Sequence, residues 1–175
     1  KDVYYMYQSE WTNQDVLHLL PHWNWKAGDS VDVWAYYNKA DDVELFLNGK
    51  SLGTSAKTGD RLHASWKVPF EKGELKVVKK RDGKVVQETS MRTAGDANRV
   101  KVSLEHEKYA TGESRDLYFV TAELVDQEGN SVLLNDQEIE FIVKGDAKVL
   151  GTDNGFQADL RGLHRPNRKT FKGKA

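Results

Sequence analysis

Residues 43–53 read Val-Glu-Leu-Phe-Leu-Asn-Gly-Lys-Ser-Leu-Gly, and this stretch predicts the fold class. Its odd-numbered positions up to Leu47 are apolar and alternate with Glu44 and Phe46, which is the period of two expected of a β-strand. The alternation stops at Asn48-Gly49, a pair that tolerates positive φ at both positions of a tight turn. The stretch therefore predicts a β-hairpin.

The same pattern recurs on both sides of this hairpin. Alternating apolar sets occupy residues 31–37 and 62–68, and Asp82-Gly83 separates two further runs at 75–78 and 84–88 as a second hairpin signal. Frequent turns between short apolar runs are typical of β-sandwiches and barrels. We therefore expect an all-β fold of antiparallel strands.

A polar segment of small residues, Ala-Gly-Asp-Ala-Asn-Arg at 94–99, interrupts the strand pattern and is the expected domain boundary. We predict two consecutive Ig-like antiparallel β-sandwiches, the first over residues 14–95 and the second over 96–175. Strands of the second are expected within 100–104, 118–124, 139–143 and 147–151, and residues 170–173 look like the entry to a last strand that is truncated.

The first thirteen residues follow a different period. Val3, Tyr7 and Trp11 recur every four residues and Asp2 can cap them, so a short helix is predicted. Its aromatic content is too high for an isolated surface helix. We therefore interpret residues 1–13 as a segment that packs against a larger partner.

Composition excludes several classes of function. Charged residues make up 30% and hydrophobic residues 38% of the 175, which is typical of a soluble globular protein. A formal net charge of -1 gives no general attraction to nucleic acid or anionic lipid. No apolar run approaches the roughly 20 residues of a membrane span, no signal peptide is read at the start, and cysteine is absent.

Metal and cofactor motifs are not recognisable. His18 and His22 are four residues apart, but a proline separates them and zinc needs three or four convergent ligands. Asp126, Glu128 and Asn130 superficially resemble a calcium loop, but the later bidentate glutamate is missing, so a polar turn is expected. We predict no metal site and no cofactor.

Carboxylates are abundant, but none has the context of a catalytic acid. Glycoside hydrolysis needs two of them held roughly 5–10 Å apart in a cleft. Glu10, Glu44, Glu123 and Glu140 are expected on surface faces or next to a partner, with nothing nearby to raise a pKa. We predict no catalytic residue in this chain.

The densest group of aromatic residues lies near the N-terminus, and it supplies the candidate site. Flat rings beside amide donors suit a contact between domains, and they equally suit stacking against sugar rings or burial in a simple core. The candidate barrel-interface or sugar-contact residues are Trp11, His22, Trp23, Asn24 and Trp25.

Three of these stretches form an ordered set that resembles a known family. Residues 2–12 (DVYYMYQSEWT), 17–25 (LHLLPHWNW) and 43–53 (VELFLNGKSLG) resemble the region just after the catalytic barrel in bacterial glycoside hydrolases of family 2, the β-galactosidase type. The resemblance implies that the first stretch is the last helix of the (β/α)₈ barrel. It implies that the second stretch leads into a β-sandwich and that the third is a hairpin within it.

The second half resembles the Ig-like domain that follows in that family, itself similar to invasin-type Ig repeats. In the family a final strand comes after the last matching motif, and it is missing here. The matching stretches are residues 109–112 (YATG), 117–130 (LYFVTAELVDQEGN), 139–145 (IEFIVKG), 150–155 (LGTDNG) and 168–173 (RKTFKG).

The resemblance implies a non-catalytic accessory region of a retaining glycoside hydrolase that is exported to the periplasm or outside the cell. The family's catalytic glutamates lie on barrel strands that this chain does not contain, so none is transferred to it. The implied partner is the catalytic barrel of the same parent chain. Two alternatives stay open: a module that binds galactose-containing glycans through exposed tryptophans, and an adhesin-like Ig repeat.

Overall fold

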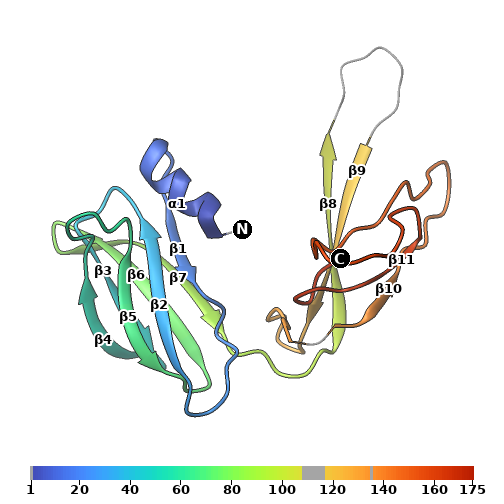
Figure 1. The fold of residues 1–175 in the computed structure, drawn as a ribbon. Coiled ribbons are helices and arrows are strands. Elements are labelled where there is room, and N and C mark those ends of the chain that lie inside the picture. Colours follow the sequence, from blue (N-terminus) through green and yellow to red (C-terminus); the bar gives the residue numbers. More distant parts are fainter. Residues whose placement is uncertain (1, 108–116, 135) are drawn as a thin grey trace. The chain divides into compact units, whose positions relative to one another are not determined.

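The computed structural model describes residues 2–107, 117–134 and 136–175, and these form two compact units, Lys1–Thr93 and Ala94–Ala175 (Figure 1). The predicted all-β class is confirmed, since a single helix accompanies eleven strands in the described residues. Tyr109–Gly112, quoted above for the family resemblance, lies outside the described residues. No helix in the described part of the chain has the length and apolar character to span a membrane.

The first unit is a β-sandwich of two antiparallel sheets. One sheet has the order β1-β2-β5 and the other has the order β4-β3-β6-β7. The strands are β1 (Leu17–Leu20), β2 (Ser30–Tyr37), β3 (Asp42–Leu47), β4 (Lys50–Ser55), β5 (Ala64–Pro69), β6 (Glu74–Arg81) and β7 (Lys84–Arg92).

Both hairpins predicted from the sequence are confirmed. Asn48 and Gly49 have φ of 50° and 80° and connect β3 to β4, with Leu47 opposite Lys50. Asp82 and Gly83 have φ of 52° and 70° and connect β6 to β7. Positive φ at both central positions gives the turn a twist that matches its flanking strands.

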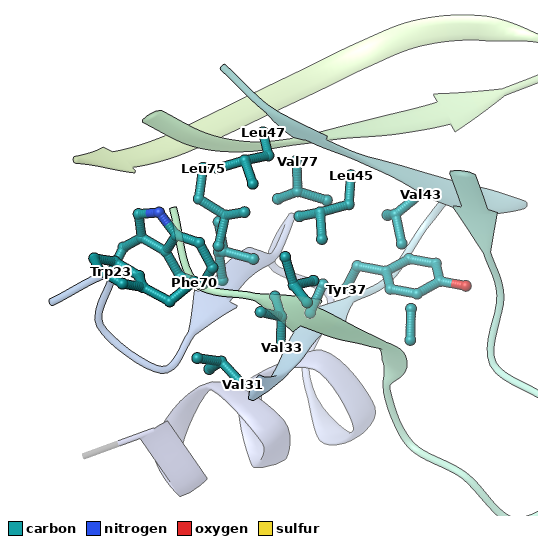
Figure 2. Close-up of a cluster of buried hydrophobic side chains, with 14 residues drawn as sticks. Trp23, Val31, Val33, Tyr37, Val43, Leu45, Leu47, Phe70, Leu75 and Val77 are labelled. Carbon is teal, nitrogen blue, oxygen red and sulfur yellow. The ribbon is translucent and has the colours of Figure 1, made fainter. Parts of the chain in front are cut away.

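The core of this unit lies between the two sheets, because alternate residues of each strand point inward. Figure 2 shows side chains of β2 meeting those of β3 and β6, with Trp23 and Phe70 at one end. The buried cluster consists of Leu19, Trp23, Val31, Val33, Ala35, Tyr37, Val43, Leu45, Leu47, Ala64, Val68, Phe70, Leu75 and Val77.

The predicted N-terminal helix is confirmed as α1 (Asp2–Trp11). It contacts strands β1 and β2 of the first unit (Figure 1). The helix therefore belongs to this unit and covers part of the three-stranded sheet.

The second unit contains a long antiparallel pair, β8 (Arg99–Glu107) with β9 (Leu117–Val125), and a short pair, β10 (Glu138–Glu140) with β11 (Asn167–Lys169). After β11 the backbone turns and runs beside β9. The N–H of Leu124 donates to the carbonyl of Gly173 at 2.8 Å, and Ala122 and Ala175 exchange two backbone hydrogen bonds.

Two strand predictions for this unit are wrong. Residues 147–151 form no strand, and only 139–140 of the expected run 139–143 belong to β10. A period-two pattern yields a strand only where a neighbouring backbone is available to pair with it. Here a side-chain network around Arg168 organises the region instead: its guanidinium donates to Asp159, to the carbonyls of Thr152, Arg161 and Gly162, and to the Thr152 hydroxyl.

Candidate functional site

Helix α1 has two faces of different character, because residues three and four apart in a helix share a face. Asp2, Tyr5, Met6 and Ser9 form the face turned to the sheet, where Ser9 is buried. The opposite face is an outward stripe of four large side chains that are 44–77% exposed. We call it the α1 stripe, and it consists of Val3, Tyr4, Tyr7 and Trp11.

The inner face of α1 is held by specific contacts with β1 and with the β4–β5 loop. The Tyr5 ring stacks on the His18 imidazole with centroids 3.8 Å apart, and His18 Nε2 lies 2.9 Å from the Asp2 carboxylate. Glu10 forms an ion pair with Lys57 of the loop. These contacts fix the rotation of the helix, so the orientation of the α1 stripe is set by the fold.

The rings of the α1 stripe also order one another. Tyr7 and Trp11 stack with centroids 4.6 Å apart and an interplanar angle of 20°. Trp11 is nevertheless 77% exposed. A row of exposed aromatic side chains on a rigid helix is typical of a contact surface.

Residues 21–25 form a compact loop between β1 and β2. The indole N–H of Trp25 donates to the carbonyl of His22 at 2.8 Å, and the two rings stack with centroids 4.8 Å apart. The backbone N–H of Asn24 donates to His22 Nδ1. Since these bonds close within the loop, Trp25 is presented to solvent in one orientation, with 39% of it exposed.

Trp23 does not belong to this surface, and its assignment as an interface or sugar contact is wrong. It is 1% exposed, its ring packs edge-on against Phe70 at 5.2 Å, and its indole N–H donates to the carbonyl of Glu71 at 2.9 Å. Trp23 therefore packs in the hydrophobic core although its neighbours His22 and Asn24 belong to the loop. Its apolar area and its one donor are both satisfied inside the sandwich.

Trp34 is not among the residues that the sequence indicates as candidates, but it lies on an outer surface of the same unit. It is 38% exposed on β2 and stacks on His63 with centroids 4.3 Å apart. Burial lowers the pKa of His63, and the charge of Arg61 adds to this effect, so its neutral form is favoured. The alternation of β2 in the sequence indicates this exposure, because the side chain of Trp34 points to the opposite face of the sheet from the buried Val33.

Two of the glutamates considered for catalysis form ion pairs, Glu44 with Lys80 and Glu123 with Lys174. A hydrogen bond from Lys80, assisted by one from Ser51, holds the pKa of Glu44 below its usual value. Burial acts to raise the pKa of Glu123, but hydrogen bonds from Ser131 and Lys174 outweigh it and leave that pKa lowered. A general acid for glycoside hydrolysis needs a raised pKa, so these two groups are unsuited to that role.

The acidic turn near residue 126 is a polar turn whose buried carboxylate also binds a distant segment of the second unit. The Asp126 carboxylate accepts hydrogen bonds from the backbone N–H of Asn130 at 2.7 Å, from its side-chain amide at 3.0 Å, and from the N–H of Gly95 at 2.9 Å. Its oxygens are thus used within the fold. Among the described residues, no three His, Asp or Glu side chains are grouped so that they could hold a metal ion.

Two family models match the chain, one for each unit. A domain of unknown function, DUF4982, matches residues 28–87, and the glycoside hydrolase family 2 C-terminal domain 5 matches residues 100–175. The whole chain is 45% identical over 174 residues to the β-galactosidase BoGH2A of Bacteroides ovatus. This chain belongs to the C-terminal region of glycoside hydrolase family 2.

Solved structures of bacterial glycosidases share the fold. A β-glycosidase from Bacteroides vulgatus superimposes with a TM-score of 0.86 at 33% identity, over 99% of this chain and 22% of that one. A family 2 glycosyl hydrolase from Bacteroides cellulosilyticus gives 0.84 at 31% identity, over 97% of this chain and 26% of that one.

The chain corresponds to a small part of its relatives. It is matched over 99% of its own length but covers 20% of the Bacteroides ovatus β-galactosidase. A β-glucuronidase of Formosa agariphila is 23% identical over 149 residues, which is 84% of this chain and 15% of that protein. Relatives with different named activities therefore contain a region similar to this chain.

Proposed function

We propose that this chain is a non-catalytic module that packs against the catalytic domain of its family 2 parent and stabilises it. The α1 stripe is the observation that carries this proposal. Four large side chains point outward from a helix whose rotation is fixed by its inner face. An exposed row of this kind marks a contact surface in a soluble protein.

The distribution of the region among relatives supports a shared, non-catalytic role. The Bacteroides ovatus relative is named a β-galactosidase and a Formosa agariphila relative is named a β-glucuronidase, yet both contain it. A module that set the substrate would be expected to differ between the two. A module that supports a common catalytic domain would be retained in both.

The parent's activity follows as a second part of the proposal. We infer that the parent hydrolyses β-linked glycosides with retention, that its catalytic glutamates lie outside this chain, and that it acts in the periplasm or outside the cell. The lowered pKa values of Glu44 and Glu123 support the absence of a general acid at those positions.

The test is made in the longer parent protein, with Tyr4, Tyr7 and Trp11 changed to Ser together. Truncation of a buried aromatic anchor at a contact costs about 2 kcal/mol or more. We expect a lower thermal transition of the catalytic domain and faster proteolysis, with KM nearly unchanged in the protein that remains folded. The matched control is Val85→Ser with Val86→Ser, two exposed apolar residues on β7.

An equal effect of the stripe and control variants would overturn the proposal. So would a stripe variant whose thermal transition and proteolysis match those of the unaltered parent. A change in KM with unchanged stability would instead assign the aromatic residues to substrate binding.

Sugar binding is a second candidate function, and the geometry of Trp25 favours it. One ring face is covered by His22 and the indole N–H is already bonded, so the exposed remainder is apolar ring surface of the type that packs on sugar C–H groups. Titration of the chain with galactose-containing oligosaccharides, followed by calorimetry, tests it. Binding that is lost in Trp25→Ala and retained in Trp34→Ala would support this candidate.

A further inference from the structure

Strand β8 has an open edge in the second unit. It pairs along all nine of its residues with β9, from Arg99 opposite Val125 to Glu107 opposite Leu117. In the described part of the chain, β9 is the only strand that pairs with it. Long exposed edge strands are templates for pairing with another strand, and natural proteins usually shield them.

The backbone groups on this edge can be identified from the other side of the hairpin. The N–H groups of Ala122 and Leu124 donate to residues 173–175, on the side of β9 away from β8. Alternate residues of an antiparallel strand direct their backbone groups to opposite sides. The residues opposite these two on β8 also point away from the ladder, so Val102 and, by the same alternation, Leu104 present free N–H and C=O groups at the open edge.

The side chains of β8 separate into a charged face and an apolar face. Lys101 and Glu105 are exposed on one face, with Ser103 midway between them. Val102 and Leu104 lie on the other face and are 63% and 60% exposed. Residues at equal distances before and after Ser103 are thus similar in size but, at 101 and 105, opposite in charge.

We propose that two copies of this chain pair through the open edges of β8, antiparallel and centred on Ser103. In this register Lys101 of each copy lies opposite Glu105 of the other, which places two opposite-charge pairs across the axis. Val102 of each copy lies opposite Leu104 of the other, so the free backbone groups of these residues face one another. The strand meets itself in a two-fold, self-complementary contact.

This register pairs the opposite charges and also lets the free backbone groups form hydrogen bonds. Opposite charges directly across an antiparallel pair stabilise it, and like charges destabilise it. A parallel alignment about Ser103 would place Lys101 beside Lys101 and Glu105 beside Glu105. Charge complementarity therefore selects the antiparallel arrangement and a second copy as the occupant.

The test is sedimentation of the 175-residue chain over a range of concentrations. We expect a reversible monomer–dimer equilibrium. Glu105→Lys converts both opposite-charge pairs to Lys–Lys pairs and should raise the dimer dissociation constant by about tenfold or more. Position 105 faces Phe119 within the hairpin, so the change introduces no new charge contact with β9.

The double variant Lys101→Glu with Glu105→Lys restores opposite charges across the axis and should recover the dimer. Because position 101 lies opposite Glu123 in the same hairpin, circular dichroism is used to verify that the double variant is folded. A monomeric parent chain at the highest concentration, a dimer unaffected by Glu105→Lys, or a folded double variant that stays monomeric would each overturn the proposal.

Val102→Pro provides an independent test through the backbone. Proline removes the N–H that faces the open edge and leaves the hydrogen bonds to β9 in place, which is the setting in which edge strands tolerate proline. We expect a folded monomer. A folded Val102→Pro chain that still dimerises would show that another surface joins the copies.

Discussion

Replacing Trp23 with alanine should remove much of the stability of the first unit, although the residue lies in a loop between two surface aromatic residues. Complete burial of an indole removes about 200 Å² from water, which corresponds to about 5 kcal/mol at about 25 cal/mol per Å². Alanine retains a small part of this area, and the carbonyl of Glu71 loses its donor. We expect a loss of about 4 kcal/mol, within the range of about 3–5 kcal/mol typical of tryptophan truncations in cores.

The assay is urea denaturation followed by far-ultraviolet circular dichroism, fitted with separate transitions for the two units because two-state behaviour holds for single domains. Trp25→Ala is the matched control, since that residue is 39% exposed and bonds only within its own loop among the contacts described above. We expect the control to cost about 1 kcal/mol or less. A Trp23→Ala chain as stable as the Trp25→Ala chain would refute the assignment of Trp23 to the core.

Three further predictions concern buried charges. Arg168→Leu should destabilise the second unit by about 3–5 kcal/mol in urea denaturation, because the carbonyls of Thr152 and Gly162 lose their buried donor and Asp159 loses one of its two arginine partners. A hydrogen bond from the N–H of Arg161 lowers the pKa of Asp159 to about 2, and one from the Asn130 amide lowers the pKa of Asp126 to about 2. A carboxylate whose pKa is lower in the folded state than in the unfolded state stabilises the fold above pH 3.8. Thermal unfolding measured over a series of pH values should therefore show this stability lost between about pH 4 and pH 2. Lys79 is fully buried and paired with the exposed Asp15, so Asp15→Ala should lower the unfolding midpoint of the first unit in urea, whereas Lys79→Met should leave it unchanged or raise it.

Local patterns were sufficient to predict most of the first unit. Every second residue is buried along β3 and along β2 from Ser30 to Ala35, as the alternation predicts, and the Asn-Gly turn has the positive φ that its residue types favour. The helix at the N-terminus was predicted from its four-residue period. These features depend on neighbours within a few positions, so the sequence contains the information directly.

The position of Trp23 depends on contacts distant in sequence. Residues 22–25 place three aromatic rings within four positions, and no period distinguishes the one that turns inward. The choice is made by Phe70 and Glu71, almost fifty residues later, which receive the ring and its N–H. The sequence therefore identifies the aromatic group but does not show that Trp23 is buried while Trp25 is exposed.

The second unit shows the same limit in its strands. The sequence predicts a short strand at 147–151, but these residues form none, and the hydroxyl and carbonyl of the next residue, Thr152, accept hydrogen bonds from the buried guanidinium of Arg168. Arg168, whose charged side chain is buried, makes several of the hydrogen bonds in this region. A pattern of apolar positions does not indicate where a buried arginine will be satisfied.

The central claim, that this region assists catalysis without performing it, is tested most directly by a turnover measurement. The purified 175-residue chain is incubated with nitrophenyl β-galactoside, and fractions from size-exclusion chromatography are assayed individually. We expect no release of nitrophenol above the buffer rate in the fractions that contain the chain. Turnover that co-elutes with the chain and disappears on substitution of one of its own carboxylates would contradict the claim.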